Sequence, residues 1–207
     1  MSRFIIFEGN EGTGKSTHIN FASKYLTEKG VKNIITREPG GTALGESIRD
    51  IILDDKLELD AISEAILFYA SRITNYNNII LNSLNEGVYV ICDRFHYSTL
   101  VYQGICCGDK KVMSLHEILD DYFSKKISII FHLDASIENC LSRINSRTSS
   151  DKFESQGEEL LVKIKSAYNQ VFKGNNKVIK IMTDEKKILV QQNIAKHLDK
   201  LLNAKNN

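Results

Sequence analysis

The chain has 207 residues, of which 42% are hydrophobic and 26% are charged, and its formal net charge at pH 7 is +1. This is ordinary globular usage, and the length suffices for one domain with a sizeable core. A balanced charge argues against a protein that binds nucleic acid or a membrane surface through a general excess of basic residues. Any affinity for phosphate must therefore come from cations clustered at one place.

Cysteine usage and hydropathy indicate a cytoplasmic protein without a membrane partner. The four cysteines show no zinc-type spacing, and the adjacent Cys106 and Cys107 are poorly placed for a disulfide. No apolar run approaches the roughly 18 residues of a membrane span, and no basic segment leads into an apolar one at the start of the sequence. We expect reduced thiols and no targeting segment.

Apolar runs and helical patterns alternate along the chain. Strands are predicted at residues 4–7, 33–36, 88–92, 127–133 and 178–181. Helices are predicted after Ser16, at 44–53, 60–85, 114–123, 136–145 and 157–173, and around 188–201. Such alternation with short connections predicts an α/β fold, a five-stranded parallel sheet with helices on both faces, in a single domain spanning residues 1–207. Ligands of such sheets bind beyond the carboxyl ends of the strands.

Two of the predicted helices carry further signals. The long stretch at 60–85 has one apolar stripe, which indicates a core or a subunit interface. Its members are Ile62, Ile66, Tyr69, Ile73, Tyr76 and Ile80. In the next helix Ser114 and Glu117 have the spacing of a capping box, which predicts that this helix begins at Ser114.

The first strand leads directly into a phosphate-binding motif. The segment from Gly9 to Ser16 reads Gly-Asn-Glu-Gly-Thr-Gly-Lys-Ser and fits the P-loop pattern G-x-x-x-x-G-K-[ST]. Glycines let backbone N–H groups approach phosphate oxygens, and the following helix presents its positive end. Lys15 supplies a cation for the phosphates and Ser16 a hydroxyl ligand for Mg²⁺. The predicted ATP site comprises Gly9, Asn10, Glu11, Gly12, Thr13, Gly14, Lys15, Ser16 and Thr17.

Two apolar strands end in an aspartate that could hold Mg²⁺ through water, Asp93 and Asp134. We prefer Asp93, because Arg94 beside it would bring a cation to the transferring phosphoryl group. Asp134 precedes a predicted helix, and a role as the N-cap of that helix is an equal alternative.

Three further segments resemble those of bacterial thymidylate kinases. Arg37 to Thr42 reads Arg-Glu-Pro-Gly-Gly-Thr, and Phe68 to Arg72 fits the family's F-x-x-x-R. The third segment begins at Asp93-Arg94 and continues to Tyr102-Gln103-Gly104. Together with the P-loop they follow the family's order over about residues 3–200. The resemblance implies a P-loop kinase fold, a cis bond before Pro39 and a homodimer formed through the helix at 60–85.

The resemblance also implies a binding site for dTMP. Phe68 would stack on the thymine ring, Arg72 would reach thymine O4, and Tyr102 would select deoxyribose. A buried arginine without a polar partner would be costly, which also favours a ligand role for Arg72. The implied substrate-binding set is Glu11, Arg37, Pro39, Phe68, Arg72, Arg94, Ser98, Thr99, Tyr102 and Gln103.

Members of this family place a catalytic arginine either in the P-loop or in a mobile lid. Gly12 occupies the P-loop position here, so the cation is expected from a lid at about residues 143–157, which contains Arg143, Arg147 and Lys152. Together with Lys15 and Arg94, these three residues form the predicted catalytic set.

We therefore expect phosphoryl transfer from MgATP to dTMP, giving dTDP and ADP. The acceptor phosphate is already ionised at pH 7, so no general base is needed. One alternative is another P-loop nucleotide kinase, such as a deoxynucleoside kinase, in which Glu38 could serve as the base. A second is a regulatory GTPase, which should carry an [NT]-K-x-D motif, and the sequence has none.

Overall fold

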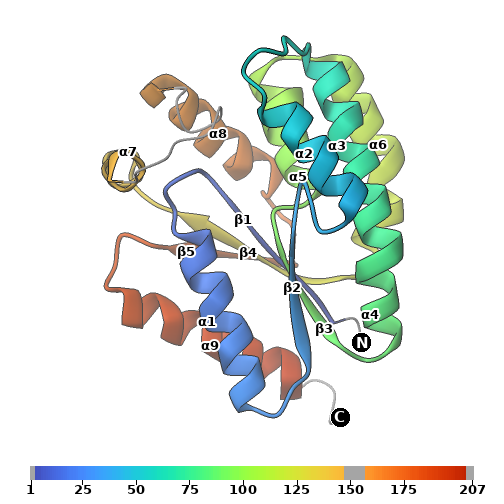
Figure 1. The fold of residues 1–207 in the computed structure, drawn as a ribbon. Coiled ribbons are helices and arrows are strands. Elements are labelled where there is room, and N and C mark those ends of the chain that lie inside the picture. Colours follow the sequence, from blue (N-terminus) through green and yellow to red (C-terminus); the bar gives the residue numbers. More distant parts are fainter. Residues whose placement is uncertain (1–2, 147–156, 204–207) are drawn as a thin grey trace.

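A computed structural model describes residues 3–146 and 157–203 of the chain. Five strands form one parallel sheet in the order β2-β3-β1-β4-β5 (Figure 1). The strands are β1 (Phe4–Gly9), β2 (Asn33–Arg37), β3 (Tyr89–Asp93), β4 (Ile127–Asp134) and β5 (Val178–Met182). The predicted fold class and all five predicted strands are therefore confirmed.

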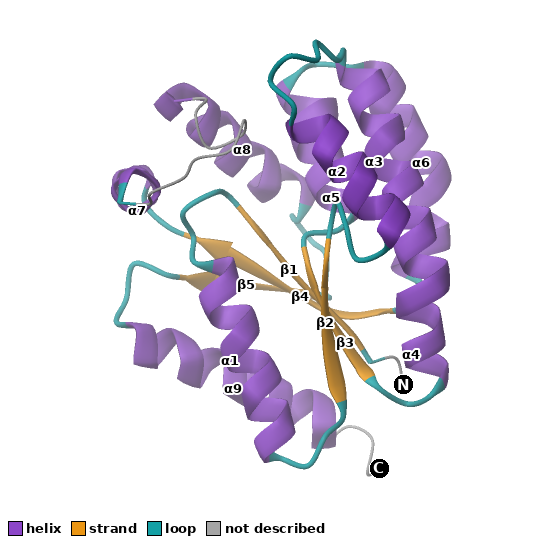
Figure 2. Cartoon of the chain, in the orientation of Figure 1, coloured by secondary structure: helices purple, strands orange, loops and turns teal. Residues whose placement is uncertain are grey.

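Helices cover both faces of this sheet (Figure 2). The α-helices are α1 (Lys15–Glu28), α2 (Ala43–Leu53), α3 (Ala61–Asn75), α4 (Leu81–Asn85), α5 (His96–Thr99), α6 (Lys110–Ser124), α7 (Ile137–Asn145), α8 (Gly157–Val171) and α9 (Lys187–Asn203). Two π-helical segments, η1 (Tyr76–Ile80) and η2 (Leu100–Cys106), continue α3 and α5. The helical stretch from His96 to Cys106 was not predicted, because its polar residues obscure the apolar spacing.

The central strand explains why two helical layers form. Phe4 and Ile6 of β1 belong to the core beneath α3, α6 and α8, whereas Ile5 and Phe7 belong to the core beneath α1 and α9. Side chains alternate across a strand, so the apolar run at residues 4–7 must be covered on both faces. This arrangement leaves the carboxyl edge of the sheet for the loops that follow β1, β2 and β3 (Figure 1).

The structure corrects two details of the predicted elements and shows how the members of the apolar stripe are divided between core and surface. Helix α6 begins at Lys110 with Asp109 as N-cap, whose carboxylate accepts from the backbone N–H of Lys111 at 2.8 Å, so Ser114 lies inside the helix. Ser136 rather than Asp134 caps α7. The apolar stripe at 60–85 is divided, because Tyr69, Tyr76 and Ile80 are buried while Ile66 and Ile73 are exposed.

Candidate active site

The P-loop joins β1 to α1 at the carboxyl edge of the sheet. Gly12 has φ of 74°, and a Cβ there would lie 2.5 Å from the carbonyl oxygen of Cys140, so no other residue fits. The ammonium group of Lys15 is buried and donates to the carbonyl oxygens of Gly9 at 3.1 Å and Asn10 at 2.9 Å. Burial lowers the pKa of Lys15, and the Arg94 charge adds to this effect. The cradle is thus already shaped to receive a phosphate anion.

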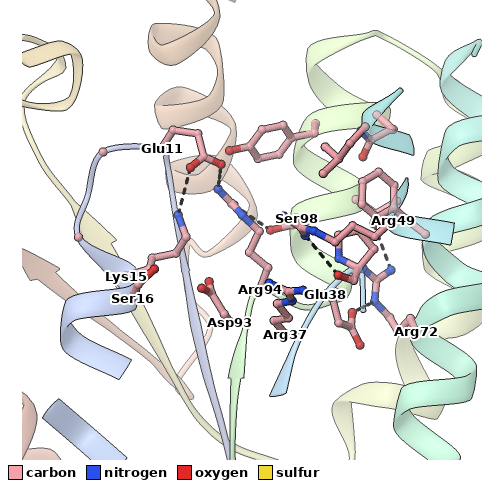
Figure 3. Close-up of a pocket in the computed structure, with 18 residues that line it drawn as sticks. Glu11, Lys15, Ser16, Arg37, Glu38, Arg49, Arg72, Asp93, Arg94 and Ser98 are labelled. Carbon is pink, nitrogen blue, oxygen red and sulfur yellow. Dashed lines mark hydrogen bonds and ion pairs between the residues drawn. The ribbon is translucent and has the colours of Figure 1, made fainter. Parts of the chain in front are cut away.

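A cavity extends from the P-loop to helices α2, α3 and α5 (Figure 3). Its lining includes twelve of the predicted site residues: Glu11, Gly12, Gly14, Lys15, Ser16, Arg37, Pro39, Phe68, Arg72, Asp93, Arg94 and Ser98. The lining also includes three other predicted residues, Thr99, Tyr102 and Gln103. Segments separated by up to about ninety residues of sequence therefore meet at one hollow, as expected for the carboxyl edge of a parallel sheet.

Arg94 lies at the centre of this cavity. It follows β3 and has φ of 64°, a left-handed conformation that costs a non-glycine residue roughly 1–2 kcal/mol. Its guanidinium donates to the Gly9 carbonyl at 3.0 Å, and it forms an ion pair with Glu11. Burial alone would lower the pKa of Arg94, but the Glu11 carboxylate raises it well above its usual value. Arg94 is thus a fixed cation beside the P-loop.

A buried carboxylate that the sequence did not single out, that of Glu8, shares two hydrogen-bonding hydroxyl groups with Arg94. Glu8, in β1, accepts from the Phe95 backbone N–H at 2.8 Å, the Ser98 hydroxyl at 2.6 Å and the Tyr168 hydroxyl at 2.8 Å. Arg94 donates to the same two hydroxyls at 3.2 and 3.3 Å. Burial raises the pKa of Glu8, and the nearby Arg94 charge opposes that rise. In sequence, Glu8 interrupts an apolar strand, which is the signal that could have identified it.

Arg72 lies at the far end of the cavity from Lys15. Its Nε donates to the Glu38 carboxylate at 2.5 Å and its Nη1 to the Thr99 hydroxyl at 3.1 Å, and both charged side chains are 1% exposed. The guanidinium carbon also lies 4.9 Å from the centre of the Tyr69 ring. The argument that a buried Arg72 lacks an internal anionic partner is therefore wrong, because Glu38 is that partner. The predicted ligand role of Arg72 rests instead on its place in the cavity wall.

The remaining predicted acceptor residues have distinct surroundings. Phe68, on the helical face that also carries Arg72, is half-buried and lines the cavity. The Arg94 guanidinium carbon lies 5.1 Å from the centre of the buried Tyr102 ring, and Gln103 donates to Glu64 at 2.7 Å. Arg37 forms an exposed ion pair with Glu46 at 2.8 Å. The bond between Glu38 and Pro39 is cis, as the resemblance implied.

Two residues have the right chemistry for a metal ion next to the phosphate cradle. Asp93 and Ser16 both line the cavity, and the buried Oδ1 of Asp93 has no hydrogen-bond partner among the described residues. An unpaired carboxylate oxygen beside a serine hydroxyl suits Mg²⁺, which prefers oxygen ligands. Asp134 is instead engaged by Lys165 at 3.2 Å and Lys180 at 2.8 Å, so its charge is already compensated.

Some predicted residues lie away from the cavity lining. Gly9, Asn10 and Thr13 form the body of the P-loop, and Thr17 is exposed on α1. Arg143 belongs to α7, not to a loop, and donates to the carbonyl oxygens of Gly12 at 3.1 Å and Thr183 at 2.7 Å. The prediction that Arg143 lies in a lid loop is therefore wrong. Arg147 and Lys152 lie outside the described residues.

The cavity wall also contains residues that the sequence did not reveal as site residues. Arg49 and Leu53 of α2 line it, and Arg49 donates to the Pro39 carbonyl at 3.3 Å. Glu38, considered only as a base, lines it as well. Arg49 lies one helical turn after Gly45, which is buried, so both residues are on the same face of α2. This spacing was the signal in the sequence that could have identified Arg49.

The P-loop lies at the edge of a parallel sheet, and a second group of cations and an aromatic ring line the other end of the same cavity. This arrangement defines a P-loop nucleotide kinase. The family model for thymidylate kinase matches residues 7–194. A thymidylate kinase of Caldicellulosiruptor saccharolyticus is 35% identical over 202 residues, covering 97% of each chain. One of Francisella tularensis subsp. novicida is 34% identical over 210 residues, covering 99% of each. One of Thermosipho africanus is 38% identical over 172 residues, covering 82% of this chain and 84% of its own.

This chain therefore belongs to the thymidylate kinase family, whose members are nucleoside monophosphate kinases. That membership argues against the regulatory GTPase considered above. No helix among the described residues is long and apolar enough to cross a membrane.

Proposed function

We propose that the protein transfers the γ-phosphoryl group of MgATP to dTMP, giving dTDP and ADP. The observation that carries this proposal is one cavity with a different recognition group at each end. Lys15 and the P-loop backbone suit the phosphates of ATP, whereas Phe68 and Arg72 suit a pyrimidine base. Arg94 lies between them (Figure 3). Two nucleotides bound end to end would therefore bring their phosphates together at Arg94.

The chemistry follows from charge compensation and alignment. An acceptor phosphate oxygen is already a nucleophile at pH 7, so the protein must mainly bring two anions together. Lys15 and Arg94 provide fixed cations for this purpose. Asp93 and Ser16 would hold Mg²⁺, which neutralises charge on the β- and γ-phosphates when bound.

Sugar recognition is assigned to Tyr102 and Glu11. Tyr102 is buried and lies beside Arg94, so its ring has a fixed place in the cavity wall, and by the family resemblance that place is where a ribose 2′-hydroxyl would lie. Glu11 forms ion pairs with Arg94 and, at 3.9 Å, with Lys15. These two cations offset the repulsion between a carboxylate and the bound phosphates, which leaves Glu11 able to accept from a sugar hydroxyl.

A deoxynucleoside kinase is the competing reaction, because it needs a carboxylate base near the end of the second strand. Glu38 occupies that place, but its carboxylate is bonded to the Arg72 guanidinium and to Asn75 at 3.4 Å. These donors already occupy the carboxylate and make it less available to a sugar hydroxyl, although burial raises the pKa of Glu38 to about 7. The contacts of Glu38 therefore favour a phosphate acceptor over a nucleoside.

An assay of ADP release across a panel of acceptors tests the proposal. dTMP should be turned over, whereas thymidine should not, and the ribonucleotide analogue of dTMP should react much more slowly. Turnover of thymidine alone would replace the proposal with the deoxynucleoside kinase. Equal rates for dTMP and its ribonucleotide analogue would reject the role of Tyr102 while leaving the reaction in place.

We also propose a homodimer formed through α2, α3 and α6. These helices pack against one another and carry exposed apolar side chains. The exposed residues are Leu44, Ile51, Ile66, Ile73, Ile118 and Tyr122. An apolar face of this kind on one layer of helices is characteristic of a subunit interface.

A cytoplasmic location is proposed from the sequence, and the four cysteines are free, as a reducing compartment requires.

A further inference from the structure

A group of three metal-ligating side chains lies outside the cavity, where α5 packs against α6. His96 is the first residue of α5, and His116 and Asp120 are one turn apart on α6. His96 is fully buried, His116 is nearly so, and the side chain of Asp120 is 40% exposed. The group is therefore anchored in the core and open to solvent on one side.

The distances within this group suit a single small cation. Asp120 Oδ1 lies 2.8 Å from His96 Nε2 and 3.9 Å from His116 Nε2, and one ligand atom from each residue lies within 4.8 Å of the others. The two imidazole planes differ by 15° and their centres are 5.2 Å apart. Two imidazoles bound to one tetrahedral Zn²⁺ at about 2.0 Å have ring centres roughly 5 Å apart. The rings thus have the separation that a shared ion requires.

Burial favours the uncharged form of both imidazoles, because it lowers the pKa of His96 to about 3 and of His116 to about 4. A hydrogen bond from His96 lowers the pKa of Asp120. These directions match the neutral imidazole and charged carboxylate that coordinate a metal, although His96 carries its proton on Nε2, next to Asp120.

The second nitrogen of each ring decides how the histidines are oriented. Nδ1 of His116 lies 3.4 Å from the Tyr69 hydroxyl, which leaves Nε2 facing Asp120. Nδ1 of His96 is buried without a hydrogen-bond partner in the described structure. When a metal takes Nε2, the His96 proton moves to Nδ1, so one unpaired buried lone pair is exchanged for one unpaired buried N–H. The hydrogen bond from His96 Nε2 to Asp120 is lost in the same step, and coordination of both groups to the ion would replace it.

We propose that His96, His116 and Asp120 form a binding site for a divalent transition-metal ion of the zinc type. Two imidazole nitrogens and one carboxylate oxygen suit Zn²⁺, whereas Mg²⁺ and Ca²⁺ prefer oxygen ligands alone. Water would take the fourth position on the exposed side of Asp120. Lys177 is the nearby cation that acts on Asp120, and its ammonium is held by the Ser124 carbonyl at 2.9 Å.

This site does not depend on the proposed reaction, but it touches the same backbone. His96 follows Phe95, whose N–H donates to Glu8 and whose carbonyl accepts from Arg72 at 3.3 Å. A bound ion would fasten the start of α5 to α6. We therefore expect the ion to stabilise the segment that carries Arg94 and Ser98.

Titration of the full metal-free chain with Co²⁺, followed by competition with Zn²⁺, tests the proposal. Wild type should bind one Co²⁺ with the intense visible absorption of a tetrahedral ion and without a thiolate charge-transfer band, and Zn²⁺ should displace it. Zn²⁺ should also raise the melting temperature. Asp120→Asn and His116→Gln should each weaken Zn²⁺ binding at least roughly 10-fold.

Asp121→Asn is the matched control, because Asp121 is the next residue of α6 and its side chain is 78% exposed. It should bind Zn²⁺ as wild type does, and circular dichroism should show that all three variants are folded. Absence of Co²⁺ binding by wild type would overturn the proposal. A thiolate band, which would assign the ion to cysteine, would also overturn it, as would equal Zn²⁺ affinity in Asp120→Asn and Asp121→Asn.

Discussion

At the scale of single residues, Arg94 is central to the proposed mechanism. Its left-handed backbone and its bonds to Gly9, Ser98 and Tyr168 hold one cation beside the phosphate cradle. Replacing Arg94 with alanine should therefore lower kcat at least about 100-fold, as does loss of other contacts to a transition-state charge. Steady-state kinetics measure this change. Arg3→Ala, before β1 at the opposite edge of the sheet, serves as the control, and near-normal kcat in Arg94→Ala would remove Arg94 from the mechanism.

The buried pair of Arg72 and Glu38 makes a prediction about stability and pH. Burial raises the pKa of Glu38 to about 7 despite the opposing charge of Arg72. In Arg72→Met that opposition is lost, so the pKa of Glu38 rises further. A carboxyl whose pKa is raised by folding stabilises the fold at low pH, and this contribution is lost as the pH rises through the folded-state pKa. The destabilisation caused by Arg72→Met should therefore be larger at pH 8 than at pH 5.

Urea unfolding of wild type and Arg72→Met at the two pH values measures this difference. Arg37→Met is the control, because the Arg37–Glu46 pair is 54% and 44% exposed and should contribute only about 0–1 kcal/mol at either pH. A destabilisation by Arg72→Met that is the same at pH 5 and pH 8 would contradict the assigned coupling.

At the scale of elements, α6 shows where a local sequence pattern is misleading. Ser114 and Glu117 match a capping box, but the carboxylate of Asp109 binds the first free N–H groups of the helix, so the helix has already begun when Ser114 is reached. Asp109→Ala should lower the free energy of unfolding by about 0.5–2 kcal/mol. Ser114→Ala, at an exposed helical position, should change it by less than about 0.5 kcal/mol. Denaturant unfolding distinguishes the two, and the reverse order would restore the capping box.

The elements also show which parts of the fold and of the candidate site could be predicted from the sequence. The five strands were recognisable because a sheet covered on both faces needs mainly apolar strands, such as β4 and β1, whose first four residues are all apolar. The loops after those strands carry short motifs, so most of the cavity wall was also predictable. Partners brought together only by folding were not, such as Glu38 for Arg72 and Tyr168 for Glu8, which is 160 residues away in sequence. Such contacts leave no periodic pattern of apolar residues in the sequence.

At the scale of the whole molecule, the exposed apolar face of α2, α3 and α6 predicts association. Wild type should have twice the mass of one chain by light scattering, and Ile66→Glu should shift it toward the mass of one chain because a charge would be buried in the interface. Leu189→Glu is the control, since Leu189 is similarly exposed on α9, beneath the opposite face of the sheet. A wild-type protein with the mass of one chain would reject the homodimer.

The central claim is spatial: ATP occupies the P-loop end of the cavity, and dTMP lies against Phe68 at the other. Equilibrium titration of Phe68→Ala with each nucleotide separately tests it most directly. Stacking a base on an aromatic ring contributes about 1–3 kcal/mol, so the Kd for dTMP should rise at least roughly 10-fold while the Kd for ATP stays unchanged. An unchanged Kd for dTMP, or a loss confined to ATP, would contradict the arrangement.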